Sequence, residues 1–107
     1  MKSIKYHKLV RDEIPRIIEK SGKTCITSVL SESEYIEMLD KKLNEELAEY
    51  QESKTLEELA DLLEVIRAVA VARGSSIEEI ESIRKEKASA RGEFKKRILL
   101  LEVQEEE

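Results

Sequence analysis

Apolar side chains recur at helical spacing along most of this chain, which predicts a helical protein. A first helix is expected after Asp12, a candidate N-cap, with Pro15 in its first turn and Gly22 at its end. Its apolar face is made by Ile14, Ile17 and Ile18. Residues 24–29 follow with weakly alternating β-branched side chains, so they predict a short strand or an extended arm.

A long second helix is expected from a capping box, in which Ser31 is followed one turn later by Glu34. The pattern carries this helix to about Glu52. Its apolar stripe consists of Ile36, Leu39, Leu43, Leu47 and Tyr50. A loop of roughly three to five residues near residues 53–55 would make the next helix its antiparallel neighbour.

The third helix is expected to be apolar on almost every face. A second capping box, Thr55 with Glu58, opens it, and it runs to Arg73 before Gly74. Its apolar residues are Leu59, Leu62, Leu63, Val65, Ile66, Val69, Ala70 and Val71. Because so little polar face remains, we expect this helix to be buried nearly all round. At about 100° per residue, Glu58 projects inside the apolar arc and Asp61 lies at its edge.

A fourth helix is expected from Ser76 to Arg91. The tail, residues 97–103, is too apolar for a free end. Two interpretations of it stay open, because it either pairs as a strand with residues 24–29 or is covered by a partner. The predicted fold class is therefore all-α, a four-helix bundle in a single domain of residues 1–107, with a small β ribbon as an open addition.

Two pairs of acidic residues are predicted to meet. Glu46 and Glu49 flank the apolar stripe of the second helix, so they face the seam toward the third. Glu58 and Asp61 face the same seam from the other side. Four converging carboxylates repel one another unless they bind a cation, and oxygen-only sites favour Mg²⁺, with Mn²⁺ as an alternative. A solvated acidic face is the structural alternative, because such i, i+3 pairs are common on helices.

Composition narrows the class of protein. The chain has 107 residues, of which 40% are charged and 4% aromatic, so strong helix formers dominate. A net charge of −5 argues against binding to nucleic acid. No apolar run reaches the roughly 20 residues of a membrane span, and the N-terminus lacks a signal-peptide pattern. With one cysteine, Cys25, the composition suits a reducing compartment, and we expect a cytoplasmic protein without membrane association.

Several segments together resemble a known superfamily. The pattern Glu45-Glu46-x-x-Glu49 followed by Glu58-x-x-Asp61 is similar to the signature of the MazG-like all-α nucleotide pyrophosphohydrolases. That group includes phosphoribosyl-ATP pyrophosphohydrolases and dimeric dUTPases. Further segments that resemble one MazG-like subgroup are residues 6–15, 42–47 and 87–97.

The resemblance implies an enzyme that cleaves a nucleoside triphosphate between its α- and β-phosphates, giving a monophosphate and pyrophosphate. It implies Mg²⁺ held by Glu46, Glu49, Glu58 and Asp61. Glu45 or Glu49 would act as the base for the attacking water. Removal of non-standard nucleotides is the expected role, and hydrolysis of phosphoribosyl-ATP is the alternative.

Five basic residues are candidates for contacts with the substrate. Lys42 lies one turn before an acidic ligand, so it either meets a phosphate or forms an ion pair along the helix. For Lys87 and Arg91, the resemblance favours triphosphate binding over a solvated surface stripe. Lys8 and Arg11 resemble residues of the subgroup, and anchoring of the N-terminal arm to an acidic surface is equally open.

A single chain of this size has too few helices to cover its third helix. We therefore expect a homodimer or homotetramer to complete the bundle, and the relatives likewise build their sites within helical oligomers. The rival hypothesis from another class is a non-catalytic helical oligomerisation module, in which the acids only confer solubility. Such a scaffold has no reason to direct Glu58 and Asp61 into an apolar arc.

Overall fold

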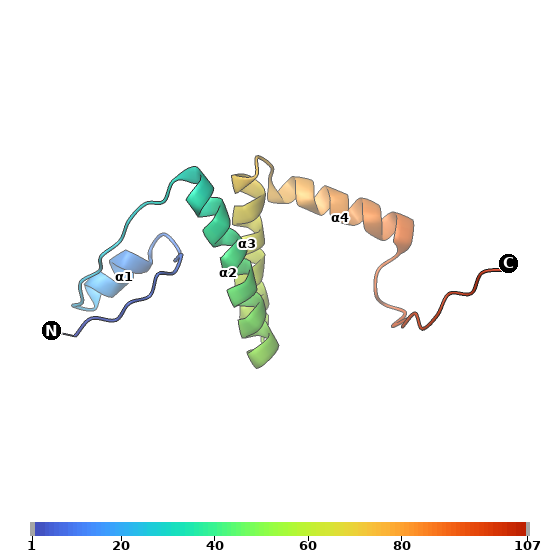
Figure 1. The fold of residues 1–107 in the computed structure, drawn as a ribbon, viewed down its shortest axis with the longest axis horizontal. Helices are drawn as coiled ribbons and strands as arrows, with labels where there is room; N and C mark the ends of the chain where they lie inside the picture. The colour runs from blue at the N-terminus through green and yellow to red at the C-terminus, as the bar shows by residue number, and fades with distance from the viewer. Residues whose placement is uncertain (1, 107) are drawn as a thin grey trace. The chain divides into compact units, whose positions relative to one another are not determined.

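The computed structural model describes residues 2–106, and within that range the chain forms four α-helices and no strand. In chain order they are α1 (Ile14–Lys20), α2 (Glu32–Ser53), α3 (Leu56–Ala72) and α4 (Ile77–Arg91) (Figure 1). The predicted all-α class with four helices is confirmed. The chain divides into two compact units after residue 77, so that α1 to α3 belong to the first unit and nearly all of α4 belongs to the second.

The first helix begins later than its predicted cap. Glu13, and not Asp12, occupies the N-cap position, and its side chain makes no capping hydrogen bond. The Glu13 carboxylate instead accepts a hydrogen bond from Nε of Arg16 at 2.9 Å. The prediction of Asp12 as the cap was wrong because a turn precedes the helix at this point. Gly22 closes the segment at a φ of 93°, a conformation that glycine adopts without strain.

The second helix begins with the predicted capping box. The Glu34 N–H donates to Oγ of Ser31 at 3.3 Å, and the Ser31 N–H donates to Oε1 of Glu34 at 3.3 Å. Both halves of the motif are thus present. The helix then continues to Ser53, one residue beyond the predicted end.

The connector between α2 and α3 consists of Lys54 and Thr55 alone. It is shorter than expected because Lys54 adopts a left-handed φ of 58°, and its N–H donates to the Tyr50 carbonyl at 2.7 Å. The Thr55 side chain caps α3 by accepting from the Glu58 N–H at 3.3 Å, whereas the Thr55 N–H donates to Oγ of Ser53. Because the Thr55 N–H already donates to Ser53, the Glu58 carboxylate makes no hydrogen bond in the cap. This carboxylate is therefore available to the seam between the helices.

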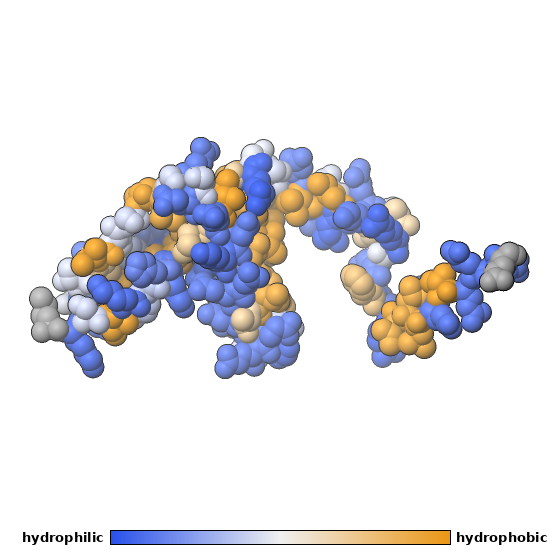
Figure 2. Space-filling model, viewed as in Figure 1, coloured by the Kyte–Doolittle hydropathy of each residue, from blue (hydrophilic) through white to orange (hydrophobic). Residues whose placement is uncertain are grey.

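The two long helices lie side by side and antiparallel (Figure 1). Leu39 of α2 and Val65 and Ala70 of α3 are the buried apolar residues of the seam. Within one chain α3 is buried on one side only, because Leu63 and Val71 are 57% and 62% exposed. Apolar side chains therefore reach the surface (Figure 2). Their predicted cover by further copies of the chain stays a prediction.

The chain that follows α4 is irregular and exposed. The apolar residues of this tail that lie at the surface are Ile98, Leu99, Leu100, Leu101 and Val103 (Figure 2). In residues 24–29, Ile26 and Val29 are also almost completely exposed. Neither segment forms a strand in the described part of the chain, and the β ribbon stays a prediction. None of the helices described has the length and hydrophobicity needed to cross a membrane.

Removal of the cap on α2 is expected to destabilise the helix pair. Ser31→Ala deletes the oxygen that accepts from the Glu34 N–H, so it should lower the free energy of unfolding by about 1 kcal/mol. Ser33→Ala, at an exposed position of the same helix, should change it by less than about 0.5 kcal/mol. Urea unfolding followed by far-UV circular dichroism measures both, and equal stabilities of the two variants would contradict the role of the cap.

Candidate metal centre

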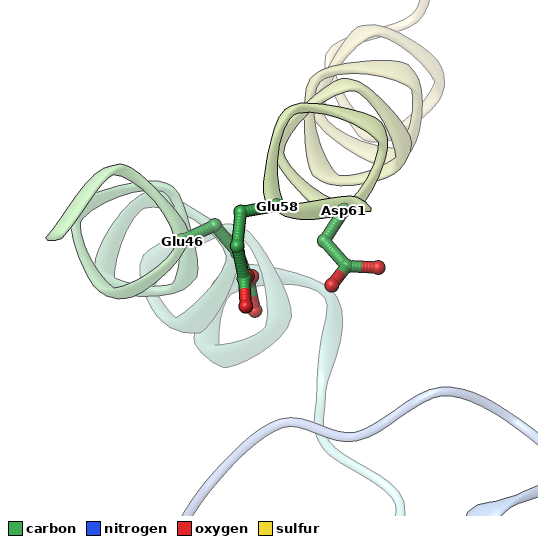
Figure 3. A group of neighbouring side chains, drawn as sticks. All are labelled: Glu46, Glu58 and Asp61. Atoms are coloured by element: carbon green, nitrogen blue, oxygen red, sulfur yellow. The ribbon is translucent and has the colours of Figure 1, made fainter. Parts of the chain in front are cut away.

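Three carboxylates from two helices meet at the seam between α2 and α3. Glu46 projects from α2, and Glu58 and Asp61 project from α3 (Figure 3). One carboxylate oxygen of each residue lies within 4.8 Å of those of the other two. The structure therefore brings together three of the four predicted metal ligands, which we call the acidic trio.

Glu46 is as deeply buried as the apolar residues around it. It is 7% exposed, compared with 9% for Val65. Its Oε2 atom is buried and has no hydrogen-bond partner in the described chain, and the same is true of Oε2 of Glu58. A buried oxygen without a partner loses the hydrogen bonds that water would give it. These two atoms therefore remain free to accept a hydrogen bond or to ligate a cation.

The cluster makes two of its members harder to ionise. Burial is the largest cause of the raised pKa of Glu46, the charge of Glu49 raises it further, and the Lys42 ammonium lowers it. The pKa of Glu58 is also raised, first by burial and then by the charges of Glu49 and Asp61. The site therefore favours positive charge, whether it comes from protons or from another cation.

Glu49 borders the acidic trio without joining it. Its side chain is exposed, and none of its oxygens belongs to the group that lies within 4.8 Å. Its charge nevertheless acts on both Glu46 and Glu58. Its predicted roles as a metal ligand and as a base stay predictions.

Lys42 lies between two acids of its own helix. Its Nζ is 3.4 Å from a carboxylate oxygen of Glu45 and 3.4 Å from one of Glu46. The ion pair along the helix, one of the two interpretations of this residue, is thus present. The Lys42 side chain also lines a pocket, and its predicted contact with a phosphate stays a prediction.

The N-terminal arm, residues 2–13, is anchored to the acids of α2 and α3. Nη2 of Arg11 donates to Oδ1 of Asp61 at 2.8 Å, and Nζ of Lys8 lies 3.9 Å from Glu45. The anchoring that was one interpretation of these two basic residues is therefore observed. Their predicted role toward a substrate stays a prediction.

A pocket of about 260 Å³ opens beside the acidic trio. Its lining residues are Val10, Arg11, Ile14, Lys42, Glu46 and Asp61. Val10 and Ile14 were not among the predicted site residues. Their signal in the sequence is their position on either side of Arg11 in the segment 6–15. The pocket is smaller than the roughly 300–1,000 Å³ of common ligand sites, so it suits part of a nucleotide better than all of it.

Two of the predicted substrate-binding residues belong to the second unit. Lys87 and Arg91 are exposed on α4. Arg84, in the same basic stripe, donates to the carboxylate of Glu81 at 2.6 Å. The predicted contact of Lys87 and Arg91 with a triphosphate stays a prediction.

The donor set of the acidic trio fits a hard divalent cation. All three members are carboxylates, and two of their oxygens are buried without a partner in the described chain. Carboxylate oxygens are the ligands that Mg²⁺ and Mn²⁺ take most readily in proteins. Glu46, Glu58 and Asp61 are therefore the residues that would hold such an ion.

The metal-free protein is expected to become less stable as the pH rises above about 4.5. A carboxyl group with a raised pKa binds its proton more tightly in the folded chain than in the unfolded one. The resulting stability is fully present below the ordinary value of 4.5 and is lost as the pH rises through the raised values of Glu46 and Glu58. Melting temperatures measured in a chelating buffer between about pH 5 and pH 8 should fall accordingly.

A pair of matched variants tests the source of this dependence. Glu58→Gln removes one raised group, so it should flatten the pH dependence and raise the melting temperature at neutral pH. Glu57→Gln removes an exposed charge from the neighbouring position and should leave the slope unchanged. The same slope in both variants would refute the contribution of the cluster.

Comparison with known proteins gives a partial similarity. A stretch of 47 residues is 49% identical to an uncharacterized protein of Mycolicibacterium smegmatis, covering 44% of this chain and 48% of that protein. The chain thus spans about half the length of this relative. No family model matches the sequence, and no solved structure matches it.

Proposed function

We propose that this protein is a Mg²⁺-dependent nucleoside triphosphate pyrophosphohydrolase of the MazG-like type. The observation that carries the proposal is the buried carboxylate of Glu46, whose unpartnered oxygen lies in the acidic trio with Glu58 and Asp61. A buried carboxylate oxygen without a partner destabilises a two-helix seam, and Lys42 reaches only the other oxygen, Oε1, of Glu46. The resemblance of the two acidic motifs to those of the MazG-like enzymes supplies the reaction.

The pocket beside the acidic trio carries both signs of charge, which suits a phosphate chain accompanied by a cation. Its acidic side is formed by Glu46 and Asp61, and its basic side by Arg11 and Lys42. A bound Mg²⁺ would supply positive charge against phosphate oxygens and would acidify an attacking water. The guanidinium and the ammonium would contact the remaining phosphate oxygens and orient the chain.

In the proposed reaction, the oxygen of a water molecule forms a bond to the α-phosphorus. The bond from that phosphorus to the oxygen bridging the α- and β-phosphates breaks, and this oxygen leaves with pyrophosphate. The water proton passes to a carboxylate base. Glu49 is the better candidate for this base, because Glu45 is shared between the ammonium groups of Lys8 and Lys42.

The expected substrates are non-standard nucleoside triphosphates, and phosphoribosyl-ATP is the alternative within the same reaction class. Both carry the anhydride that the acidic trio would act on. The resemblance alone supports a contact of Lys87 and Arg91, on α4, with a triphosphate.

A non-catalytic oligomerisation module is the rival function. The observation in its favour is the apolar surface of α3, where Leu63 and Val71 are more than half exposed in the single chain. This surface supports a homodimer or homotetramer under either hypothesis. The buried, unpartnered oxygens of the acidic trio favour the enzyme, because an interaction surface gains nothing from them.

Product analysis tests the proposed reaction directly. The panel of substrates contains standard, deoxy and damaged nucleoside triphosphates and phosphoribosyl-ATP. With Mg²⁺ or Mn²⁺, the purified protein is expected to cleave at least one of them to a monophosphate and pyrophosphate. Glu58→Gln should reduce this turnover by more than about 100-fold, because loss of even an indirect partner of a metal ligand costs about 10–100-fold. Glu57→Gln, its exposed neighbour, should retain it.

Ion-exchange chromatography separates the outcomes. Monophosphate together with pyrophosphate supports cleavage between the α- and β-phosphates, whereas release of inorganic phosphate would contradict it. No turnover of any compound in the panel, with no rise of the melting temperature in Mg²⁺, would favour the oligomerisation module.

Charge reversal on α4 tests the predicted triphosphate contact. Lys87→Glu should raise KM by at least about tenfold, because an attraction to phosphate becomes a repulsion. Lys85→Glu makes the same change in net charge two positions away and should alter KM little. Steady-state kinetics on the best substrate measures both, and equal KM values would assign Lys87 to the solvated surface.

A further inference from the structure

Charge, more than apolar burial, attaches the N-terminal arm to the helix pair. Every residue of the arm is exposed except Leu9, which is half-buried. Its large side chains Ile4 and Tyr6 are each 68% exposed. Apolar burial therefore contributes little to the position of the arm.

The charged contacts that join the arm to the helix pair fall on acids at or beside the candidate metal centre. Arg11 reaches Asp61 at 2.8 Å, and Lys8 reaches Glu45 at 3.9 Å. The side chains of Arg11 and Asp61 are 59% and 43% exposed, so water and salt weaken their attraction. These contacts position the arm, and they are weak enough to exchange.

Asp61 has two uses that compete with each other. It is the partner of Arg11, and it is also a member of the acidic trio. A guanidinium and a divalent cation on one carboxylate repel each other. The backbone of Lys42 is fixed within α2. Arg11 lies before α1, where its carbonyl accepts a hydrogen bond from the Ile14 N–H at 3.1 Å, and the residues that precede it in the arm are exposed except Leu9.

We propose that the N-terminal arm is a strap that a divalent cation displaces. Without the cation, Arg11 neutralises Asp61 and occupies one side of the pocket. A cation bound by the acidic trio releases Arg11, and its guanidinium then becomes available to a phosphate of the nucleotide. This regulation rests on the proposed function of the same site.

Calorimetric titration of the full chain with Mn²⁺ is the first part of the test. Arg11→Ala removes the guanidinium that competes with Mn²⁺ for Asp61. This variant should bind Mn²⁺ about two- to fivefold more tightly than the wild type, which is the range expected from loss of an exposed ion pair. Arg73→Ala is the matched control. Arg73 pairs with Asp40 at 3.0 Å with similar exposure, away from the acidic trio, and its loss should leave the affinity unchanged.

Limited digestion with trypsin is the second part, because it detects displacement and not merely the loss of a positive charge. Mn²⁺ should accelerate cleavage of the wild type after Arg11, since this side chain leaves Asp61 when the cation binds. Glu58→Gln, which lacks a member of the acidic trio, should show no acceleration.

The outcomes distinguish the strap from the metal centre. If wild-type protein binds Mn²⁺ but Arg11→Ala binds it equally or more weakly, or if Mn²⁺ fails to accelerate cleavage of the arm, the strap is overturned and the metal centre stands. If neither protein binds Mn²⁺, both proposals are overturned. Tighter binding by Arg11→Ala together with faster cleavage of the wild type supports the strap.

Discussion

Burial of like charges at the seam between α2 and α3 is the constraint around which the first unit is arranged. Glu46 occupies a place as enclosed as that of the apolar residue Val65. Glu58 faces it across the seam, and the charge of Glu46 adds to the burial that already raises the pKa of Glu58. Lys42 and Arg11 offset part of this repulsion from two sides. The packing of two helices therefore creates an affinity for positive charge that neither helix has alone.

Short-range signals in the sequence were sufficient to predict the helices and the direction of Glu58. The capping box of Ser31 and Glu34 is a local motif, and it formed as predicted. Glu58 was recognisable because it interrupts an apolar arc, and helical periodicity alone fixes that direction. The proximity of Glu58 to Glu46 was predictable because a short connector makes consecutive helices pack antiparallel.

Features that depend on long-range packing or on rare backbone geometry could not be predicted. The pairing of Arg11 with Asp61 joins residues 50 positions apart, and no periodicity encodes it. The connector was shorter than expected because Lys54 takes a left-handed conformation that is uncommon for residues other than glycine. Glu49 lies one turn from Glu46 but outside the acidic trio, and helical spacing alone does not predict this difference. The apolar pattern of α3 predicted a helix that is buried nearly all round with the help of further copies of the chain. In the single chain, part of its apolar surface is therefore exposed.

The two-residue connector also has a consequence for local unfolding, because the parts of the first unit differ in the free energy needed to open them. The acidic trio lies within residues 46–61, a single helical hairpin, and closing so short a loop costs little chain entropy. Docking of the N-terminal arm closes a much longer stretch of chain and buries little apolar surface. The arm is consequently the part that opens at the lower free energy, so local unfolding there leaves the hairpin and its acids assembled.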